Sequence, residues 1–437
     1  MLRLFYDVIF FIFSLFYLPL FLIKGKWNRA SLSRFGIISE ETVERLKEKP
    51  VLWAHAVSVG EISLAVGFIN RLRGDWPNAQ FLITTTTPAG HEVAQKIKNE
   101  EDFLLYFPAD FRWTVKAFLK KVSPAAVVLF ETEIWPNLIF TLSEKKVPVL
   151  ILNGRISDKA MKGYRRVRFF LRKVLERVSA IGVQDERMRE RFIALGARPE
   201  CVIRTGNLKF DWMPPASSSD GVSSLRRFCR RPSEFLWIAG STHDGEEEKI
   251  FEIYSRLKTR HGHLRLLVAP RHLHRVTEIE KLAVKKGLPL RKISAQISDL
   301  AAAVSRDEIW LLNQMGVLAS LYETADAVFV GGSLVPVGGH NLVEPAFFEK
   351  AIVFGAHMNN FLEMAKEFKG NQAALQVRDS EELSVELNSL IGDPARRMQL
   401  GKAARRLVLR HQGATDKSRE LLMVYWQKSK ERKLVSV

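Results

Sequence analysis

The chain contains the segment Phe329-Val330-Gly331-Gly332-Ser333, and after a short loop it continues with Gly338-Gly339-His340-Asn341-Leu342-Val343-Glu344. The pattern predicts a buried strand, a glycine-rich turn and the start of a helix. Glycines at such a turn allow backbone N–H groups to approach a ligand closely, and a helix N-terminus favours negative charge. We therefore predict that His340, Asn341 and Glu344 line a sugar or nucleotide site. Many α/β folds have similar turns without a ligand, so the rest of the chain must support this interpretation.

Short apolar runs alternate with helix-like stretches along most of the chain. The runs lie at residues 50–57, 80–85, 125–130, 147–153, 180–184, 235–240, 264–269, 327–330 and 351–354. This alternation predicts an α/β fold with doubly wound parallel sheets. Ligand-facing residues of such sheets lie just beyond the carboxyl ends of the strands, where Glu61, Thr86, Glu131 and Asn153 fall.

The composition changes between residues 211 and 233, where Pro214-Pro215, Ser217-Ser218-Ser219 and two pairs of arginines occur. Such a segment is typical of a linker. We therefore expect a membrane anchor at 1–25, a first Rossmann-like domain at 26–211, a linker at 212–234 and a second Rossmann-like domain at 235–437. The two domains are expected to face a cleft.

The composition indicates a folded protein with an anionic partner. The 437 residues are 47% hydrophobic and 26% charged, and the formal net charge is +18. Nucleic acid, anionic lipid and a phosphorylated substrate would each match this charge. The basic residues are dispersed and the aromatic residues lie mainly in apolar runs, which argues against nucleic acid. Cys201 and Cys229 form no CxxC pair or metal-ligand cluster, as expected of free thiols in a reducing compartment.

Residues 4–23 are almost wholly apolar and are broken only by Asp7. Such a run spans a hydrocarbon core of roughly 30 Å as a helix. Lys24, Lys26 and Arg29 follow, and the positive-inside rule then places the rest of the chain in the cytoplasm. We predict attachment to an anionic membrane surface at the cytoplasmic face of the cell inner membrane. Asp7 leaves two modes open, a spanning helix or a helix that lies in the interface.

Three acidic residues at strand ends are candidates for catalysis. Glu61 falls in the first turn of a predicted helix, where a carboxylate is either a favourable charge on the helix dipole or a general base for an attacking hydroxyl. Glu131 and Glu133 are two residues apart. In an extended chain their side chains would point to opposite sides, so they would not share one role.

Two basic residues are candidates for binding phosphate. Lys209, in Gly206-Asn207-Leu208-Lys209-Phe210-Asp211, is either a solvated surface lysine or a charge that stabilises a leaving phosphate. Arg271 follows Pro270 at a predicted strand end, and its planar guanidinium suits phosphate. The sequence lacks a Walker A motif, GxGxxG, HExxH and Asp-x-Asp, so a metal-bound diphosphate donor is less favoured than a metal-free donor with one phosphate.

Together these motifs resemble those of the 3-deoxy-D-manno-oct-2-ulosonic acid (Kdo) transferases of lipopolysaccharide assembly. The resemblance covers nearly the whole chain and rests on the apolar N-terminus, residues 58–61, 84–88, 131–137, 206–211, 240–247 and 270–272, and the glycine segment at 331–345. It implies a two-domain GT-B glycosyltransferase that moves Kdo from CMP-Kdo to a lipid A precursor. It further implies inversion at the anomeric carbon, no metal or other cofactor, an acceptor-binding first domain and a nucleotide-sugar-binding second domain.

The resemblance also implies roles for individual residues. Glu61 would be the general base, and Glu131 and Lys209 would stabilise the transition state. The residues that would hold CMP are Pro270, Arg271, Met315, Gly316, Val317, Asn341, Leu342, Val343 and Glu344. Residues 313–317 read Asn-Gln-Met-Gly-Val where the family commonly has Asp-Thr-Met-Gly-Glu, so any side-chain role there is in doubt and backbone contacts would survive. A UDP-sugar-dependent transferase of envelope lipid synthesis is the alternative.

Overall fold

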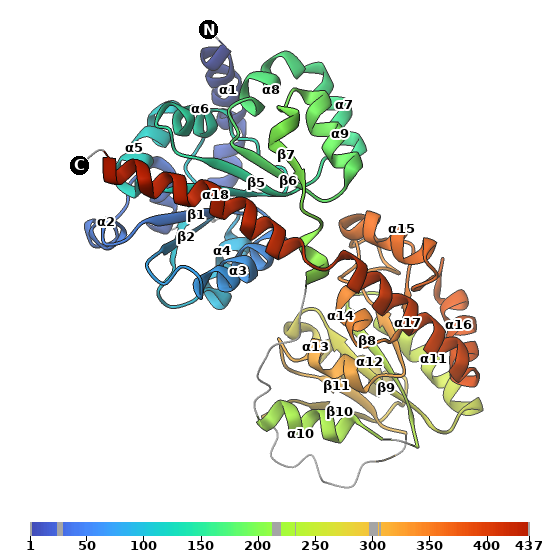
Figure 1. The fold of residues 1–437 in the computed structure, drawn as a ribbon. Helices are drawn as coiled ribbons and strands as arrows, with labels where there is room; N and C mark the ends of the chain where they lie inside the picture. Colours follow the sequence, from blue (N-terminus) through green and yellow to red (C-terminus); the bar gives the residue numbers. More distant parts are fainter. Residues whose placement is uncertain are drawn as a thin grey trace. The chain divides into compact units, whose positions relative to one another are not determined.

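The computed structural model describes residues 2–23, 29–211, 220–231, 233–296, 305 and 307–435. The chain divides into two compact units (Figure 1). Unit 1 consists of Met1–Asp211 and Gln412–Val437, and unit 2 consists of Trp212–His411. Within the described residues each unit contains a seven-stranded sheet whose paired strands all run parallel.

The sheet of unit 1 has the strand order β3-β2-β1-β4-β5-β6-β7. Its strands are β1 Val51–His55, β2 Gln80–Thr85, β3 Phe103–Tyr106, β4 Ala126–Phe130, β5 Val149–Gly154, β6 Ala180–Val183 and β7 Val202–Arg204. The helices of this unit are α1 Leu2–Ile23, η1 Arg29–Phe35, α2 Glu40–Lys47, α3 Val59–Arg73, α4 Pro88–Ile97, α5 Arg112–Val122, α6 Pro136–Glu144, α7 Asp158–Arg166, α8 Arg168–Leu175, α9 Glu186–Leu195, η2 Pro199–Cys201, η3 Leu208–Asp211 and α18 Ala414–Val435. The strand order reverses between β1 and β4, so the topological switch point lies there.

The sheet of unit 2 has the strand order β10-β11-β9-β8-β12-β13-β14. Its strands are β8 Phe235–Thr242, β9 Leu264–Pro270, β10 Leu290–Ile293, β11 Ile309–Leu312, β12 Ala327–Val330, β13 Ala351–Phe354 and β14 Leu375–Gln376. The helices are α10 Asp220–Cys229, α11 Glu247–Arg260, η4 Leu273–Arg275, α12 Val276–Lys285, α13 Leu318–Leu321, η5 Tyr322–Thr324, α14 Val343–Phe347, η6 Asn359–Phe361, α15 Leu362–Gly370, α16 Ser380–Gly392 and α17 Pro394–His411. Here the switch point lies between β8 and β12.

The central strands are buried along their whole length. β1, β4, β5 and β9 consist of buried residues throughout, which is typical of parallel sheets with helices on both faces. Trp53 of β1 and Trp237 of β8 are fully buried at the middle of the two sheets. The predicted α/β class with two doubly wound parallel sheets is confirmed.

The C-terminal helix α18 belongs to unit 1, whereas the expected second domain ran to residue 437. Trp426 of α18 stacks on Trp76 with ring centroids 4.6 Å apart, and Tyr425 OH donates to Ser179 O at 2.7 Å. The carboxylate of Asp211 accepts from Gly413 N–H at 2.7 Å at the start of the helix. Apolar burial against the first sheet therefore decides where this helix packs.

The expected linker at 212–234 is shorter in the structure. Residues 212–219 lie outside the described residues, but α10 begins at Asp220. Leu225 and Cys229 of α10 are buried, and Phe228 packs on Trp310 of β11 with ring centroids 4.8 Å apart. Residues 220–229 are therefore part of the fold of unit 2, because they bury an apolar helix face there.

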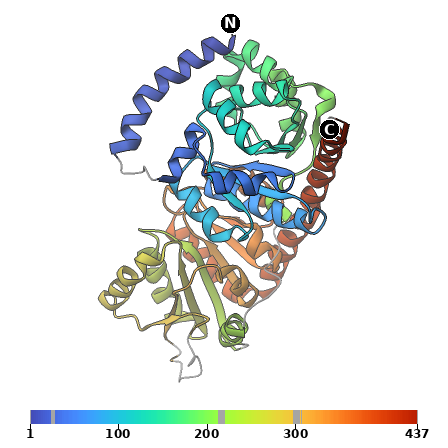
Figure 2. The ribbon, with the colours of Figure 1, turned by 90° about the vertical axis from the view of Figure 1, so that its left-hand side faces the viewer.

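Helix α1 runs along the outside of unit 1 (Figure 2). Among the helices of the described residues, none is both long and apolar enough to cross a bilayer. Lys24 and Lys26 lie outside the described residues. The membrane anchor at 1–25 therefore stays a prediction.

Candidate active site

Glu61 lies in the first turn of α3, shortly after the central strand β1. Ser58 caps this helix: its Oγ accepts from Glu61 N–H at 3.2 Å and donates to Glu61 Oε1 at 2.8 Å. Val57 N–H donates to Glu61 Oε2 at 2.9 Å. Glu61 thus completes a variant of the capping box, in which its carboxylate accepts from the residue before the N-cap, and its structural interpretation is correct in part. Each oxygen has one donor, so the half-buried carboxylate keeps lone pairs for a hydroxyl or a proton.

Glu131 and Lys209 form an ion pair at the end of β4. Lys209 Nζ donates to Glu131 Oε1 at 2.9 Å, and the two side chains are 17% and 14% exposed for Lys209 and Glu131. The segment that carries Lys209 is held by buried Asn153, whose Oδ1 accepts from Leu208 N–H at 3.0 Å. Lys209 is therefore not a solvated surface lysine, and the structure brings two of the predicted residues together.

Glu133 lies close to the same carboxylates. Trp135 Nε1–H donates to Glu133 Oε2 at 2.9 Å. Burial and the negative charges of Glu61 and Glu131 raise the pKa of Glu133 to about 7. The expectation that Glu131 and Glu133 point apart assumed an extended chain, but the backbone of Glu131 is left-handed with φ 60°. The chain turns at Glu131, so its neighbours no longer follow the alternation of a strand.

His55, the last residue of β1, faces Glu133. The side chain is fully buried, and its Nδ1 lies 3.0 Å from Thr84 O. Its Nε2 has no hydrogen-bond partner in the described part of the chain and lies 4.0 Å from Glu133 Oε2. Burial lowers the pKa of His55 to about 3, so the imidazole is neutral. A neutral imidazole next to a carboxyl group with a raised pKa can accept that group's proton in a hydrogen bond.

In unit 2 a buried carboxylate organises the glycine loop. Glu246 is fully buried and accepts four backbone N–H groups at 2.7–3.0 Å, those of His243, Gly332, Ser333 and Leu334. Gly331 lets the loop after β12 lie against the end of β8, because a Cβ there would lie 2.4 Å from Ser241 O. The N–H groups of Gly332 and Ser333 are therefore occupied by the protein, contrary to the expectation that this turn offers them to a ligand.

Arg271 follows β9 and lies near three histidines. His243 and His340 contact each other through their Nε2 atoms at 2.9 Å, and His272 packs edge-on against His243 at 5.6 Å between ring centroids. Burial and the charge of Arg271 lower the pKa of His340 to about 3. The pKa of His243 is also lowered, first by burial and then by His272 and Arg271. Arg271 thus provides a permanent positive charge next to imidazoles that are neutral at pH 7.

Asn341 and Glu344 lie within the electrostatic reach of Arg271. Asn341 Oδ1 accepts from Val343 N–H at 3.1 Å, and its Nδ2 donates to Glu344 Oε1 at 3.5 Å. Burial raises the pKa of Glu344 to about 7, against the opposing effects of Asn341 and Arg271. Leu342 and Val343 are fully buried, so they offer a ligand backbone groups alone. The structure therefore brings Arg271, His340, Asn341 and Glu344 together.

The remaining predicted residues also follow the carboxyl ends of strands in the second sheet. Pro270 ends β9, and Met315 to Val317 connect the neighbouring strand β11 to α13. Met315 is 51% exposed, whereas the side chain of Val317 is buried. Within the described residues no hydrogen bond or ion pair links this connection to Arg271. In the part of the chain that the structure describes, no group of three or more His, Cys, Asp and Glu side chains is arranged to hold a metal ion.

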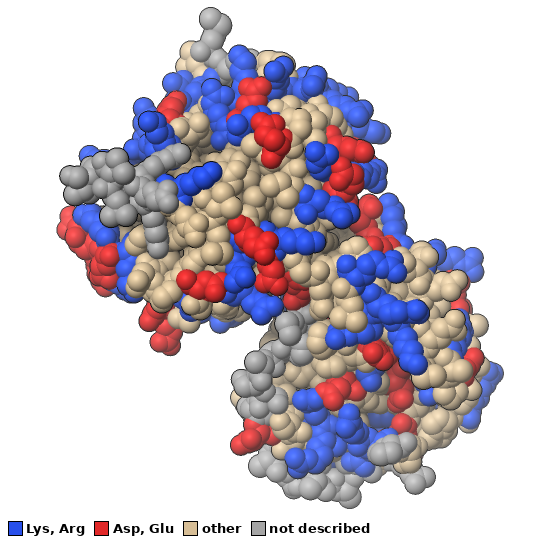
Figure 3. Space-filling model, viewed as in Figure 1, with Lys and Arg blue, Asp and Glu red and all other residues tan. Residues whose placement is uncertain are grey.

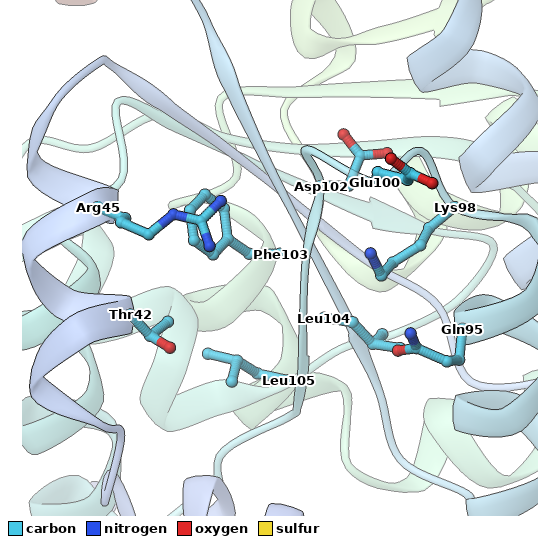
Figure 4. Close-up of a pocket in the computed structure, with 9 residues that line it drawn as sticks. All are labelled: Thr42, Arg45, Gln95, Lys98, Glu100, Asp102, Phe103, Leu104 and Leu105. Carbon is cyan, nitrogen blue, oxygen red and sulfur yellow. The ribbon is translucent and has the colours of Figure 1, made fainter.

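A cavity of about 270 Å³ lies elsewhere on unit 1, beside the edge strand β3 (Figure 4). Arg45 lies on one side of it and Lys98 on the other. Its lining residues are Thr42, Arg45, Gln95, Lys98, Glu100, Asp102, Phe103, Leu104 and Leu105. None of the predicted site residues contributes to this cavity, so it is separate from the switch point of the sheet.

Comparison with known proteins identifies the family. Residues 30–212 match the family model of 3-deoxy-D-manno-octulosonic-acid transferase (kdotransferase). The 3-deoxy-D-manno-octulosonic acid transferase of Haemophilus influenzae is 30% identical over 380 residues, which cover 86% of this chain and 88% of that protein. The chain belongs to the Kdo transferase family. It is therefore a glycosyltransferase, as the resemblance implied.

Two further comparisons limit what can be stated of this chain. A bifunctional glycosyltransferase/methyltransferase of Fusobacterium nucleatum is 35% identical over 77% of this chain, which spans about half (52%) of that protein. The UDP-GlcNAc 2-epimerase of Neisseria meningitidis, solved with UDP-GlcNAc, superimposes with a TM-score of 0.58 at 12% identity, over 86% of this chain and 99% of that one. At this identity the likeness shows the fold alone, two parallel-sheet α/β domains.

Three sets of contacts in these sites were not predicted from the sequence. Glu133 was named as a candidate, but its approach to His55 was missed because it depends on the left-handed turn at Glu131. Glu246 and the His243–His340 contact were missed because they join segments 86 or more residues apart. A signal was present, since both His243 and Glu246 belong to the motif series, but a motif does not show which atoms meet.

Proposed function

We propose that this protein transfers one or more Kdo residues from CMP-Kdo to lipid IVA, the acylated glucosamine disaccharide precursor of lipid A, in lipopolysaccharide core assembly. The observation that carries the proposal is the position of Glu61 and of the Glu131–Lys209 pair at the switch point of unit 1, in a chain of this family. Ligands of open α/β sheets bind at that point.

On the acceptor side, Glu61 is the proposed general base. Its carboxylate takes the proton from the acceptor hydroxyl while the hydroxyl oxygen forms a bond to the anomeric carbon of Kdo. The capping box supports this role because it fixes the side chain and leaves lone pairs unused. Lys209, held by Glu131, would stabilise the charge that develops as the bond to phosphate breaks.

On the donor side, the proposed site for CMP is the edge of the second sheet around Arg271. The guanidinium suits a single phosphate, and the electron pair of the broken carbon–oxygen bond remains on that phosphate as CMP leaves. Glu344 and Asn341 would bind hydroxyl or base groups of the nucleotide, and Met315 to Val317 would contribute backbone groups. The proposed reaction inverts the anomeric carbon and uses no metal cofactor, which the absence of an Asp-x-Asp motif supports.

The same proposal places the protein at the cytoplasmic face of the inner membrane, attached through its N-terminal helix. The apolar run at residues 4–23 and the net charge of +18 support an anionic membrane surface as a partner, and no nucleic-acid partner is proposed.

The test combines purified protein, CMP-Kdo and a tetra-acylated glucosamine disaccharide acceptor, with mass spectrometry of the products. Products heavier than the acceptor by one or more Kdo units are expected, and their number gives the residues transferred. No Kdo-bearing product, despite a folded protein, would contradict the proposal. In a thermal unfolding assay CMP should raise Tm and UDP should not, and the reverse would favour a UDP-sugar-dependent transferase.

A further inference from the structure

One face of α1 is fixed to unit 1 by polar contacts. Asp7 accepts from Arg112 Nε at 2.7 Å and from Asn137 Nδ2 at 2.6 Å. Arg3, one turn earlier on the same face, pairs with Glu144. These partners belong to α5 and α6, so the N-terminal half of α1 is bound to the globular unit and is not a free extension.

Tyr6 extends the same face of α1 into a buried network. Its OH donates to Asp110 Oδ2 at 2.9 Å, and its ring stacks on Phe170 of α8 with centroids 5.8 Å apart. Asp110 is fully buried and also accepts the N–H groups of Asn137 and Leu138, at 3.0 and 2.8 Å, where α6 begins. Removal of α1 from the unit would therefore take a hydrogen-bond donor away from a buried carboxylate.

The opposite face of α1 is apolar and exposed. Six side chains of this face are 50–59% exposed, namely Leu4, Val8, Ile9, Phe11, Ile12 and Leu15. Their spacing follows the helical repeat, so they form one continuous stripe. Single exposed apolar residues are ordinary on protein surfaces, but a contiguous stripe of this kind indicates an interaction surface.

A basic segment lies next to the N-terminal half of α1, which it contacts through Tyr6. Residues 159–173 contain seven Lys and Arg residues and no Asp or Glu. Arg165, Arg166 and Arg168 are exposed, and Phe169 is 63% exposed next to Phe170, which contacts α1. Figure 3 shows Lys and Arg side chains gathered over α7 and α8. An apolar stripe flanked by cationic side chains is complementary to the surface of an anionic bilayer.

We propose that α1 enters one leaflet of an anionic bilayer sideways while it stays bound to unit 1, with Phe169 and the arginines of α7 and α8 at the headgroups beside it. The inference rests on the membrane attachment proposed above and decides its mode. A spanning helix would have to leave Arg112 and Asn137 and carry Asp7 into hydrocarbon, where no water solvates a carboxylate. A sideways helix keeps every contact of its inner face and buries its outer face.

The first test measures flotation of the full-length protein with phosphatidylglycerol-containing vesicles. Val8→Ser combined with Phe11→Ser should lower partitioning at least about tenfold, because two apolar side chains leave the stripe. The matched control is Val385→Ser in α16 of unit 2, a residue that is 67% exposed, and it should bind like wild type. Unchanged partitioning of the double variant would overturn the proposal. The proposal would also be overturned if the only effect of the double substitution were a smaller particle in analytical sedimentation. That result would show that the stripe joins two copies of the chain.

The second test measures the depth of fluorophores attached to Leu4→Cys or Leu15→Cys. Labelling is selective because Cys201 and Cys229 are buried. The eleven-residue separation of the two sites corresponds to about 16 Å along a helix. A spanning helix would place the two labels at depths that differ by about this distance, whereas a sideways helix gives equal, shallow depths under lipid-borne quenchers. Unequal depths would overturn the proposal.

A third measurement separates this inference from the proposed reaction. The double variant at Val8 and Phe11 should retain Kdo transfer to a deacylated, water-soluble acceptor, because these residues lie outside the site. Vesicle binding with equal label depths in a wild-type protein that transfers no Kdo would support the sideways helix and contradict the proposed reaction. Transfer by a wild-type protein that does not bind anionic vesicles would contradict the sideways helix alone.

Discussion

Replacement of Glu246 by glutamine should destabilise unit 2 strongly. Oε1 accepts from Ser333 and Leu334 N–H, and Oε2 accepts from His243 and Gly332 N–H. The NH2 of the glutamine side chain can take the place of either carboxylate oxygen. In both orientations this NH2 faces two N–H donors. The variant therefore loses two hydrogen bonds and leaves two buried donors without an acceptor, whichever way the side chain turns.

The magnitude follows from the type of bond. A hydrogen bond to a charged group contributes roughly 1.5–3 kcal/mol, so two of them give a loss of about 3–6 kcal/mol in the free energy of unfolding of unit 2. Urea unfolding followed by hydrogen exchange of peptides from β8 and β12 would measure this loss. Glu248→Gln is the control, because Glu248 lies two residues further along the chain, is exposed, and forms a surface pair with Lys286 at 3.4 Å. A loss below about 1 kcal/mol for Glu246→Gln would contradict the stabilising role of the four hydrogen bonds to Glu246.

Three further predictions concern the sites. Glu61→Gln keeps the side-chain shape that the capping box needs, but the amide cannot take a proton. The kcat should therefore fall by about 10²- to 10⁴-fold while Tm stays nearly unchanged. Near-normal turnover would remove Glu61 from the mechanism. Arg271→Ala should weaken CMP binding in calorimetry, and an unchanged Kd would contradict the proposed nucleotide site. Burial raises the pKa of Glu133 from the ordinary glutamate value of 4.5 to about 7, so between these pH values the folded state keeps a proton that the unfolded state releases. The free energy of unfolding should therefore decline by an amount on the order of 3 kcal/mol as pH rises from about 4.5 to 7. Glu133→Gln should flatten this part of the plot of unfolding free energy, measured with urea, against pH. Parallel plots for the variant and the wild type would contradict the raised pKa.

The strand pattern was the most predictable part of the fold. Central strands of parallel sheets are buried on both faces, so they appear as continuous apolar runs such as Leu52 to Ala54 and Val127 to Leu129. The ends of such runs locate the switch point, which is why Glu61 and Glu131 were correctly placed there from the sequence. The Lys209–Glu131 pair fits the same logic, because Asn153 at the end of β5 holds the segment before Lys209.

Features that depend on distant segments were not predictable. The loop after β12 seemed open to a ligand because its local sequence contains no group that fills it, yet Glu246 does so from 86 residues away. Helix α18 follows unit 2 in sequence but packs on unit 1, since Trp426 finds its stacking partner at Trp76. The left-handed backbone of Glu131 is likewise set by tertiary contacts, because its side-chain type does not favour that conformation.

Glu61 and Glu246 occupy corresponding places, but their carboxylates differ in the number of hydrogen-bond donors that they accept. Each follows the first strand of its sheet and binds backbone N–H groups of the turn after that strand. Glu246 has four N–H donors on its two oxygens and no exposed surface, so every lone pair is occupied. Glu61 has two donors and is half-buried, so it can still accept a proton from a hydroxyl. The number of unoccupied lone pairs, more than the motif that carries each glutamate, therefore indicates a structural role for Glu246 and is compatible with the basic role proposed for Glu61.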